Sequence, residues 1–171
     1  MSFFHVLFSP AGRIRRRDYW AYSIGFGLAV LLIQYLIHRF VFALQDDAFL
    51  TDYIEWTKGN FTPYSVTILA ISALSIYPGF CIAVKRWHDR NRPALIQVLF
   101  LIWSYGTALL QSQLGDPTQP KTIAIVSALG IINFGLGIWA FVECGCLDGT
   151  YGANRYGPSP KGRGASPAAV F

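Results

Sequence analysis

The sequence predicts an all-α, polytopic membrane protein with four transmembrane helices, and three observations support this fold class. Of the 171 residues, 53% are hydrophobic and only 13% are charged, whereas soluble domains carry about a quarter charged residues. The apolar residues gather in four blocks, each long enough to cross a bilayer as a helix. These blocks lack the strict alternation of barrel strands, so helices must satisfy the backbone hydrogen bonds in lipid.

The four blocks predict the transmembrane segments in order. The first runs from about residue 19 to 44, the second from 62 to 84, the third from 94 to 111 and the fourth from 123 to 142. Together they predict one transmembrane domain over residues 1–160, followed by a flexible tail at 161–171. Residues 1–10 have a short apolar stretch with no basic region before it, so we expect an interfacial segment rather than a cleavable signal.

The distribution of basic residues predicts the orientation in the membrane. Eleven of the 14 basic residues lie in the N-terminal segment, the connection between the second and third segments, and the C-terminal tail, which share one side of a four-helix topology. The other side carries Arg39, Lys58, Lys121 and an acidic cluster of Asp46, Asp47, Asp52 and Glu55. The positive-inside rule therefore places both termini in the cytoplasm. Topology explains the net charge of +5, so we expect no nucleic-acid partner.

Three polar stretches fall at the cytoplasmic ends of the predicted helices, and we call them together the arginine cap (residues 12–20, 85–93 and 148–158). The middle stretch is too short to leave the membrane surface, so it should lie beside the other two. The candidate site residues of the arginine cap are Arg13, Asp18, Arg86, His88, Asp89, Arg90, Asn154 and Arg155.

Asp89 is the one acidic residue of the middle stretch. A partly dehydrated carboxylate needs a cationic partner, since burial without one is costly. We predict that Asp89 pairs with Arg13, and that His88 is an adjacent structural hydrogen-bond donor. Such a pair would hold the start of the first transmembrane helix against the connection between the second and third.

The three stretches resemble the motifs of the bacterial inner-membrane family catalogued as domain of unknown function 805. The residues that carry the resemblance are Gly12-Arg13 and Asp18-Tyr19-Trp20, then Arg86-Trp87-His88-Asp89, then the run from Gly149 to Pro158. The resemblance covers about residues 12–160 and implies a multi-pass protein of the bacterial inner (plasma) membrane with no assigned reaction. Two features differ from the family pattern: a long acidic loop at 45–61 and the Cys144-Gly145-Cys146 sequence.

No motif of a known enzyme class is complete in this sequence. The glycines of the third stretch are not followed by the Lys and Ser or Thr of a phosphate loop, and neither a zinc-protease helix motif nor a nucleophile elbow occurs. Asp148-Gly149 begins like a CDP-alcohol enzyme motif, but no acidic residue follows it. We therefore predict no catalytic residue and no cofactor.

The three cysteines raise the question of a metal site. Cys81, Cys144 and Cys146 could supply soft ligands for zinc or copper together with His88. The paired Cys-x-x-Cys spacing of such sites is missing. We therefore predict no metal site.

The leading function from sequence is non-enzymatic. The arginine cap would bind the bilayer's anionic lipid headgroups or a protein partner. One alternative is a small channel or transporter, formed as a homo-oligomer around Gln34 and Asn133, although such amides more often make interhelical hydrogen bonds. A second alternative is a membrane-bound enzyme that acts on lipid through His88 and Asp89.

Overall fold

The computed structural model describes residues 2–42, 62–114 and 118–164. Its helices are, in order, α1 (Phe3–Phe8), α2 (Arg16–Leu36), α4 (Pro63–Asp89), α5 (Leu95–Gln113) and α6 (Pro120–Ala140). Two π-helical segments, Ile37–Val41 and Phe141–Cys146, extend α2 and α6. The described ranges contain no strand, only an isolated bridge between Asn154 and Gly157. The predicted all-α fold is confirmed.

Four of these elements are long and apolar enough to cross a bilayer. They cover Arg16–Val41, Pro63–Asp89, Leu95–Gln113 and Pro120–Cys146. The shortest has 19 residues, which gives about 28 Å of helix against a hydrocarbon core of about 30 Å. The chain is therefore a multi-pass membrane protein, as predicted. The acidic loop at 45–61 and the last seven residues of the predicted tail lie outside the described residues.

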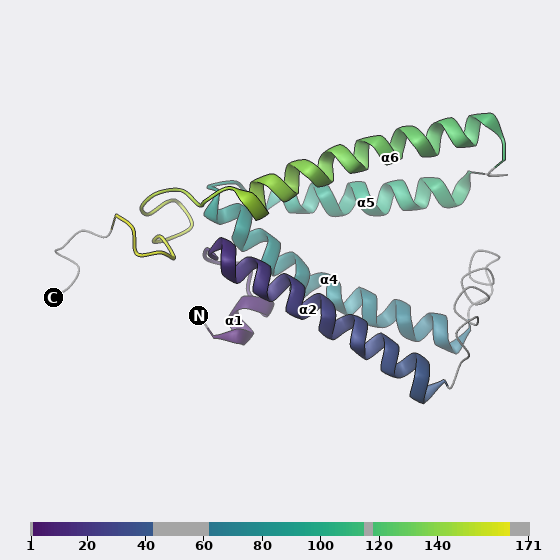
Figure 1. Ribbon diagram of the computed structural model, residues 1–171, viewed down its shortest axis with the longest axis horizontal. Helices are drawn as coiled ribbons and strands as arrows, with labels where there is room; N and C mark the ends of the chain where they lie inside the picture. Colours follow the sequence, from purple (N-terminus) through teal and green to yellow (C-terminus); the bar gives the residue numbers. More distant parts are fainter. Residues whose placement is uncertain (1, 43–61, 115–117, 165–171) are drawn as a thin grey trace.

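The four long helices form two antiparallel pairs (Figure 1). Helix α2 lies beside α4 and α5 beside α6, and the pairs meet where α4 passes into α5, then diverge toward the other end. Each pair is joined by a polar contact: the Gln34 amide donates to Ser72 Oγ (3.2 Å), and Trp103 Nε1 donates to Asn133 Oδ1 (2.7 Å). The prediction that both amides make interhelical hydrogen bonds is confirmed.

Helix α4 continues five residues beyond the predicted end at residue 84. Residues 85–89, expected in a connection, form its last turn. Two observations explain the extension. Basic side chains in the last turn favour the negative end of the helix dipole, and a Schellman motif ends the helix: the amides of Asn91 and Arg92 donate to the carbonyls of His88 (2.9 Å) and Trp87 (2.8 Å). Asn91 adopts the left-handed conformation that this motif requires (φ 57°).

Helix α1 is held against α4 by apolar packing and by one buried ammonium group. Val6 and Leu7 form a buried cluster with Ile82 of α4 and with Ile14. The Lys85 side chain is fully buried and donates to the carbonyls at residues 5, 6 and 9. Some of these carbonyls lie in the last turn of α1, where a helix leaves its backbone carbonyls without a partner. The first stretch of the arginine cap therefore starts from an anchored segment.

Candidate functional site

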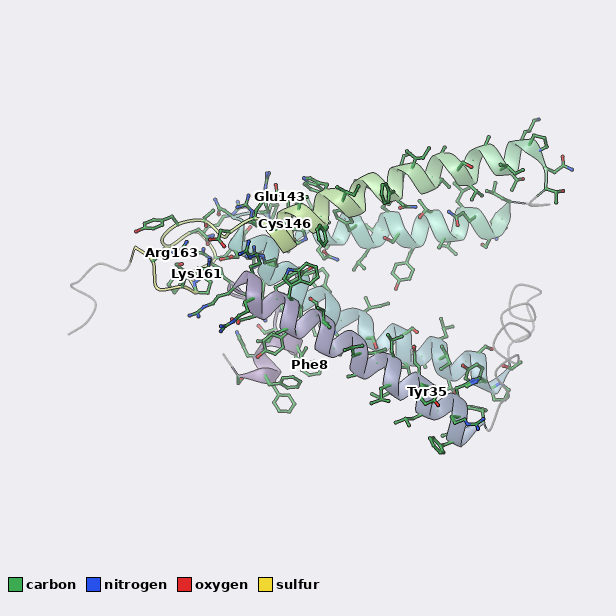
Figure 2. All side chains as sticks on the ribbon, in the orientation of Figure 1. Phe8, Tyr35, Glu143, Cys146, Lys161 and Arg163 are labelled. Carbon is green, nitrogen blue, oxygen red and sulfur yellow. The ribbon has the colours of Figure 1, made fainter. Side chains whose placement is uncertain are left out.

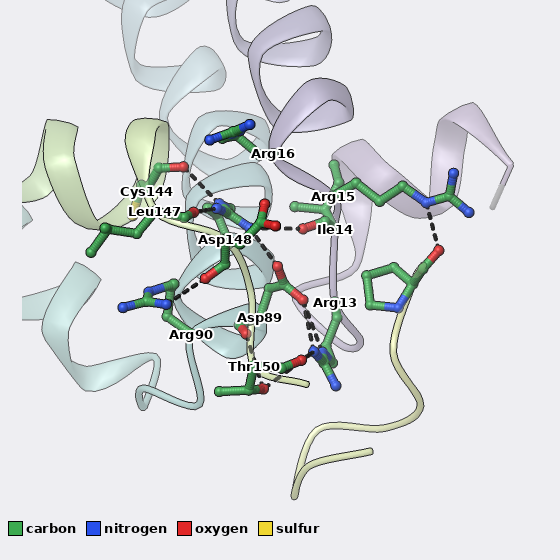
Figure 3. A network of polar contacts seen from close by, with 12 residues as sticks. Arg13, Ile14, Arg15, Arg16, Asp89, Arg90, Cys144, Leu147, Asp148 and Thr150 are labelled. Carbon is green, nitrogen blue, oxygen red and sulfur yellow. Dashed lines mark hydrogen bonds and ion pairs between the residues drawn. The ribbon is translucent and has the colours of Figure 1, made fainter. Parts of the chain in front are cut away.

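The three stretches of the arginine cap meet around the carboxylate of Asp89 at the end of α4 (Figure 3). Arg13 approaches Oδ1 with Nε (3.0 Å) and Nη2 (2.9 Å), while Arg86 donates to Oδ2. All three side chains are buried. The predicted ion pair between Asp89 and Arg13 is confirmed. Arg86, one helical turn before Asp89, is a second cationic partner.

The two buried guanidinium groups are satisfied mainly by backbone carbonyls. Arg13 donates through Nη1 to Gly152 (2.8 Å) and through Nη2 to Thr150 (2.9 Å). Arg86 donates through Nε to the carbonyl of Cys144 (2.6 Å) and through Nη2 to that at residue 147. Because a guanidinium offers five donors in a planar fork, arginine can connect several segments in a way that lysine cannot. Arg13 and Arg86 therefore organise the cap.

The third stretch covers the carbonyl groups at the end of α4. The amide of Thr150 donates to the carbonyl of Asp89 (2.8 Å), and the Asn154 side chain donates to that of His88 (2.9 Å). At Gly149, a Cβ atom would overlap the Asp89 carboxylate. A side chain at residue 149 would therefore displace either the Asp89 carboxylate or residues 148–158 from the end of α4.

The His88 ring contacts a tyrosine ring and a backbone carbonyl. Its ring stacks on that of Tyr156, with 3.7 Å between centroids and 8° between planes. Its Nδ1 lies 3.2 Å from the carbonyl of Gly12, and because a carbonyl only accepts, Nδ1 carries the proton. The prediction that His88 is a structural donor next to the ion pair is confirmed. Arg155 lies over the same tyrosine ring, 4.8 Å from its centroid, and donates to the carbonyl of Asn91 (3.1 Å).

The other candidate residues lie at the edge of this network. Arg90 donates to Glu143 Oε2 (3.0 Å) and to the carbonyl of Asp148, which ties the end of α4 to the end of the α6 region. Asp18 is not brought to Asp89. It lies 3.6 Å from Arg17, and both side chains are substantially exposed.

Sequence reasoning missed several functional contacts. Gly149, Thr150 and Lys85 act through close approach or backbone carbonyls, which give no residue-type signal. Glu143 had such a signal, because this acidic residue directly follows the fourth apolar block. A further contact that was not predicted is the hydrogen bond from Trp20 Nε1 to the carbonyl of Gly145 (3.1 Å).

The outer basic residues leave this end of the molecule strongly positive. Eleven basic and four acidic residues lie here among those described, which gives a net charge of +7. Lys161 and Arg163 lie close to this end in the view of all side chains (Figure 2). A hydrogen bond from Lys161 (2.7 Å) lowers the pKa of Asp148, with further lowering by the charges of Lys161, Arg16 and Arg163. The exposed members are Arg15, Arg16, Arg17, Arg92, Arg155, Lys161 and Arg163.

The cysteine, histidine and acidic side chains of the described residues do not gather into a metal site. In the part of the chain that the structure describes, no group of three or more His, Cys, Asp or Glu side chains could hold a metal ion. The three cysteines are free thiols, with Cys81 and Cys144 buried and Cys146 exposed. Both Asp89 carboxylate oxygens accept from arginine, so this carboxylate is held as a structural acceptor.

Comparison with known protein families identifies a match. The model of the family described as "Protein of unknown function (DUF805)" matches residues 7–158. The matched segment contains all three stretches of the arginine cap. No curated protein and no solved structure matches the chain.

Proposed function

The chain belongs to the DUF805 family, and on this premise we propose that it is a non-enzymatic protein of the bacterial inner membrane. In this proposal the arginine cap faces the cytoplasm and binds the anionic headgroups of the surrounding lipid. The inner network holds the helices together, and the outer basic residues bind the membrane surface.

The observation that carries this proposal is the division of the basic residues into two groups. Arg13, Lys85 and Arg86 are buried and satisfied by internal partners. The exposed basic residues account for most of the net charge of +7 where the candidate spans begin and end. A basic residue near an anionic bilayer surface contributes about 1 kcal/mol, and salt screens this attraction. Several such residues together favour association with anionic lipid.

The contacts of the residues behind the two alternatives favour structural roles. Gln34 and Asn133 each contact the neighbouring helix of their own pair, which supports helix pairing rather than a pore. His88 and Asp89 are engaged by a carbonyl, a tyrosine ring and two arginines, which supports a structural centre rather than acid–base chemistry.

The test compares lipid retention by two sets of variants purified in mild detergent at low salt. Arg15, Arg16, Arg17 and Arg92 are exposed, so their joint replacement by Gln should lower the amount of co-purified anionic lipid without unfolding the helices. The control replaces Arg39 and Lys121, exposed residues at the other end, by Gln and should retain the lipid. Unchanged lipid in the fourfold variant would reject lipid binding and leave a protein partner as the ligand of the cap.

A further inference from the structure

A cavity of about 720 Å³ lies between α1, the first turns of α2 and residues 156–160. This volume is in the range of pockets that hold small ligands, about 300–1,000 Å³. Two exposed arginines, Arg15 and Arg17, line it together with Asp18 and Ser159. The cavity is separate from the buried contacts of Asp89, although Arg13 contributes to its wall.

The lining changes from charged to apolar along α2. Arg17 lies at the start of the candidate span, and Ala21 lies four residues farther, about 6 Å along the helix axis. Tyr22 follows, and its ring lies 6.2 Å from that of Phe3, an exposed residue of α1. A ligand that fills this cavity therefore meets cations at one end and apolar groups at the other. A phospholipid has this arrangement, and a free phosphate does not.

The lining of the cavity carries a net positive charge. Arg13 and Arg86 share the single carboxylate of Asp89. The remaining ionised groups, Arg15, Arg17 and Asp18, sum to a net charge of +1. A phosphodiester carries a single negative charge, and arginine binds phosphate oxygens in bidentate geometry.

Arg15 is positioned for such a contact. Its Nε donates to the carbonyl of Pro160 (2.5 Å), which holds the guanidinium at the cavity wall. Within the described residues its two terminal nitrogens have no partner, so they can donate to a ligand. Among the described residues, the Arg17 side chain is held only by the 3.6 Å contact with Asp18, and it is 86% exposed.

We propose that this cavity binds the phosphodiester headgroup of a single anionic phospholipid. Arg15 and Arg17 bind the phosphate, Asp18 and Ser159 accept from headgroup hydroxyls, and an acyl chain follows Ala21 and Tyr22 toward Phe3. This inference rests on the proposed function, which it narrows from attraction to a charged surface to one defined site.

The first experiment separates this site from general attraction with two variants of equal charge. The protein is incubated in detergent with equal amounts of phosphatidylglycerol and phosphatidylethanolamine, and native mass spectrometry counts the bound lipids. We expect the wild-type protein to form a complex with one phosphatidylglycerol. Arg15→Gln/Arg17→Gln should bind this lipid about tenfold or more weakly, because the variant lacks two charge-assisted contacts. Arg16→Gln/Arg92→Gln, outside the cavity, should retain it.

The second experiment fills the cavity without changing the charge. Ala21→Trp should block the apolar part and remove the complex with one lipid, whereas Ala29→Trp, at an exposed position farther along α2, should not. Equal melting temperatures of the two variants show that neither has unfolded. A lipid complex that survives Ala21→Trp would overturn the site.

The remaining outcomes also distinguish the two proposals. Equal losses in the two double-arginine variants would overturn the single site and leave the proposed function standing. If neither double-arginine variant nor the fourfold variant loses bound lipid, both the single site and the proposed function are rejected. Displacement of the lipid by millimolar glycerol phosphate would identify a site for a soluble anion, and a preference for phosphatidylethanolamine would exclude an anionic lipid.

Discussion

Asp89 and Arg13 are 76 positions apart in the sequence and form a buried ion pair, with 2.9 Å between Oδ1 and Nη2. The pair joins the end of α4 to the segment that leads into α2. The same arginine binds the carbonyls of Thr150 and Gly152 in the third stretch. One side chain thus connects all three stretches of the arginine cap.

Removing the Asp89 charge should destabilise the protein, because Asp89→Asn leaves two buried guanidinium groups without their carboxylate. The loss should approach about 3 kcal/mol, the scale for breaking a buried ion pair. Arg13→Gln should lower the free energy of unfolding less in the Asp89→Asn background than in the wild-type protein. A double-mutant cycle of thermal unfolding in detergent measures this difference. The exposed pair of Arg17 and Asp18 supplies the control. Asp18→Asn should lower the free energy of unfolding by less than about 1 kcal/mol. Additive effects at Asp89 and Arg13 would show that they do not interact.

A methyl group at Gly149 should disrupt the cap without changing any charge. Gly149→Ala places Cβ against the Asp89 carboxylate, which two arginines hold in place. The melting temperature should therefore fall. Gly130→Ala is the matched control, because a Cβ there meets nothing within 4 Å. Equal melting temperatures for the two variants would contradict the close approach of residue 149 to Asp89.

Lys85 should control the attachment of α1. Lys85→Met keeps the length of the side chain but leaves the carbonyls at residues 5, 6 and 9 without their donor. We expect faster hydrogen exchange of the α1 amides, measured by mass spectrometry of an N-terminal peptide. Lys161 is an exposed lysine near the chain end, so Lys161→Met should leave that exchange unchanged. Unaltered protection of α1 in Lys85→Met would mean that apolar packing alone holds the helix.

The contact between Asp148 and Lys161 should depend on pH. The hydrogen bond from Lys161 lowers the pKa of Asp148 below its ordinary value. A lowered folded-state pKa means that the contact stabilises the fold above the ordinary value of about 4 and is lost as pH falls through the lowered value. In Lys161→Gln, a pH titration of the Asp148 carboxyl carbon by NMR should show a higher pKa. An unchanged pKa of Asp148 in this variant would refute the contact.

The proposed orientation predicts which positions are accessible from outside the cell. In a background with Cys81, Cys144 and Cys146 replaced by Ser, Asn60→Cys should react with a membrane-impermeant maleimide in intact cells. Ser166→Cys should react only after lysis. The reverse pattern would place the termini outside and reject a cytoplasmic cap.

The sequence predicted those parts of the arginine cap that depend on residue type. The ion pair between Asp89 and Arg13 follows from the cost of an unpaired carboxylate at the membrane surface. The Asn133 contact follows from the same need for a partner in lipid. The predicted end of the second segment was wrong by five residues. The charged side chains of residues 85–89 suggested a connection, whereas their tertiary contacts stabilise a helical turn.

What the sequence determined by itself is the class of fold: four long apolar blocks must be helices in lipid, since no other structure of that length satisfies its own backbone there. The tertiary structure decided how the ends of those helices fit together. The partners of Arg13, Lys85 and Arg86 are largely backbone carbonyls, which every residue carries, so their spacing in the sequence cannot identify them. The close approach at Gly149 and the cavity beside Arg15 likewise exist only once segments distant in the chain are folded against each other.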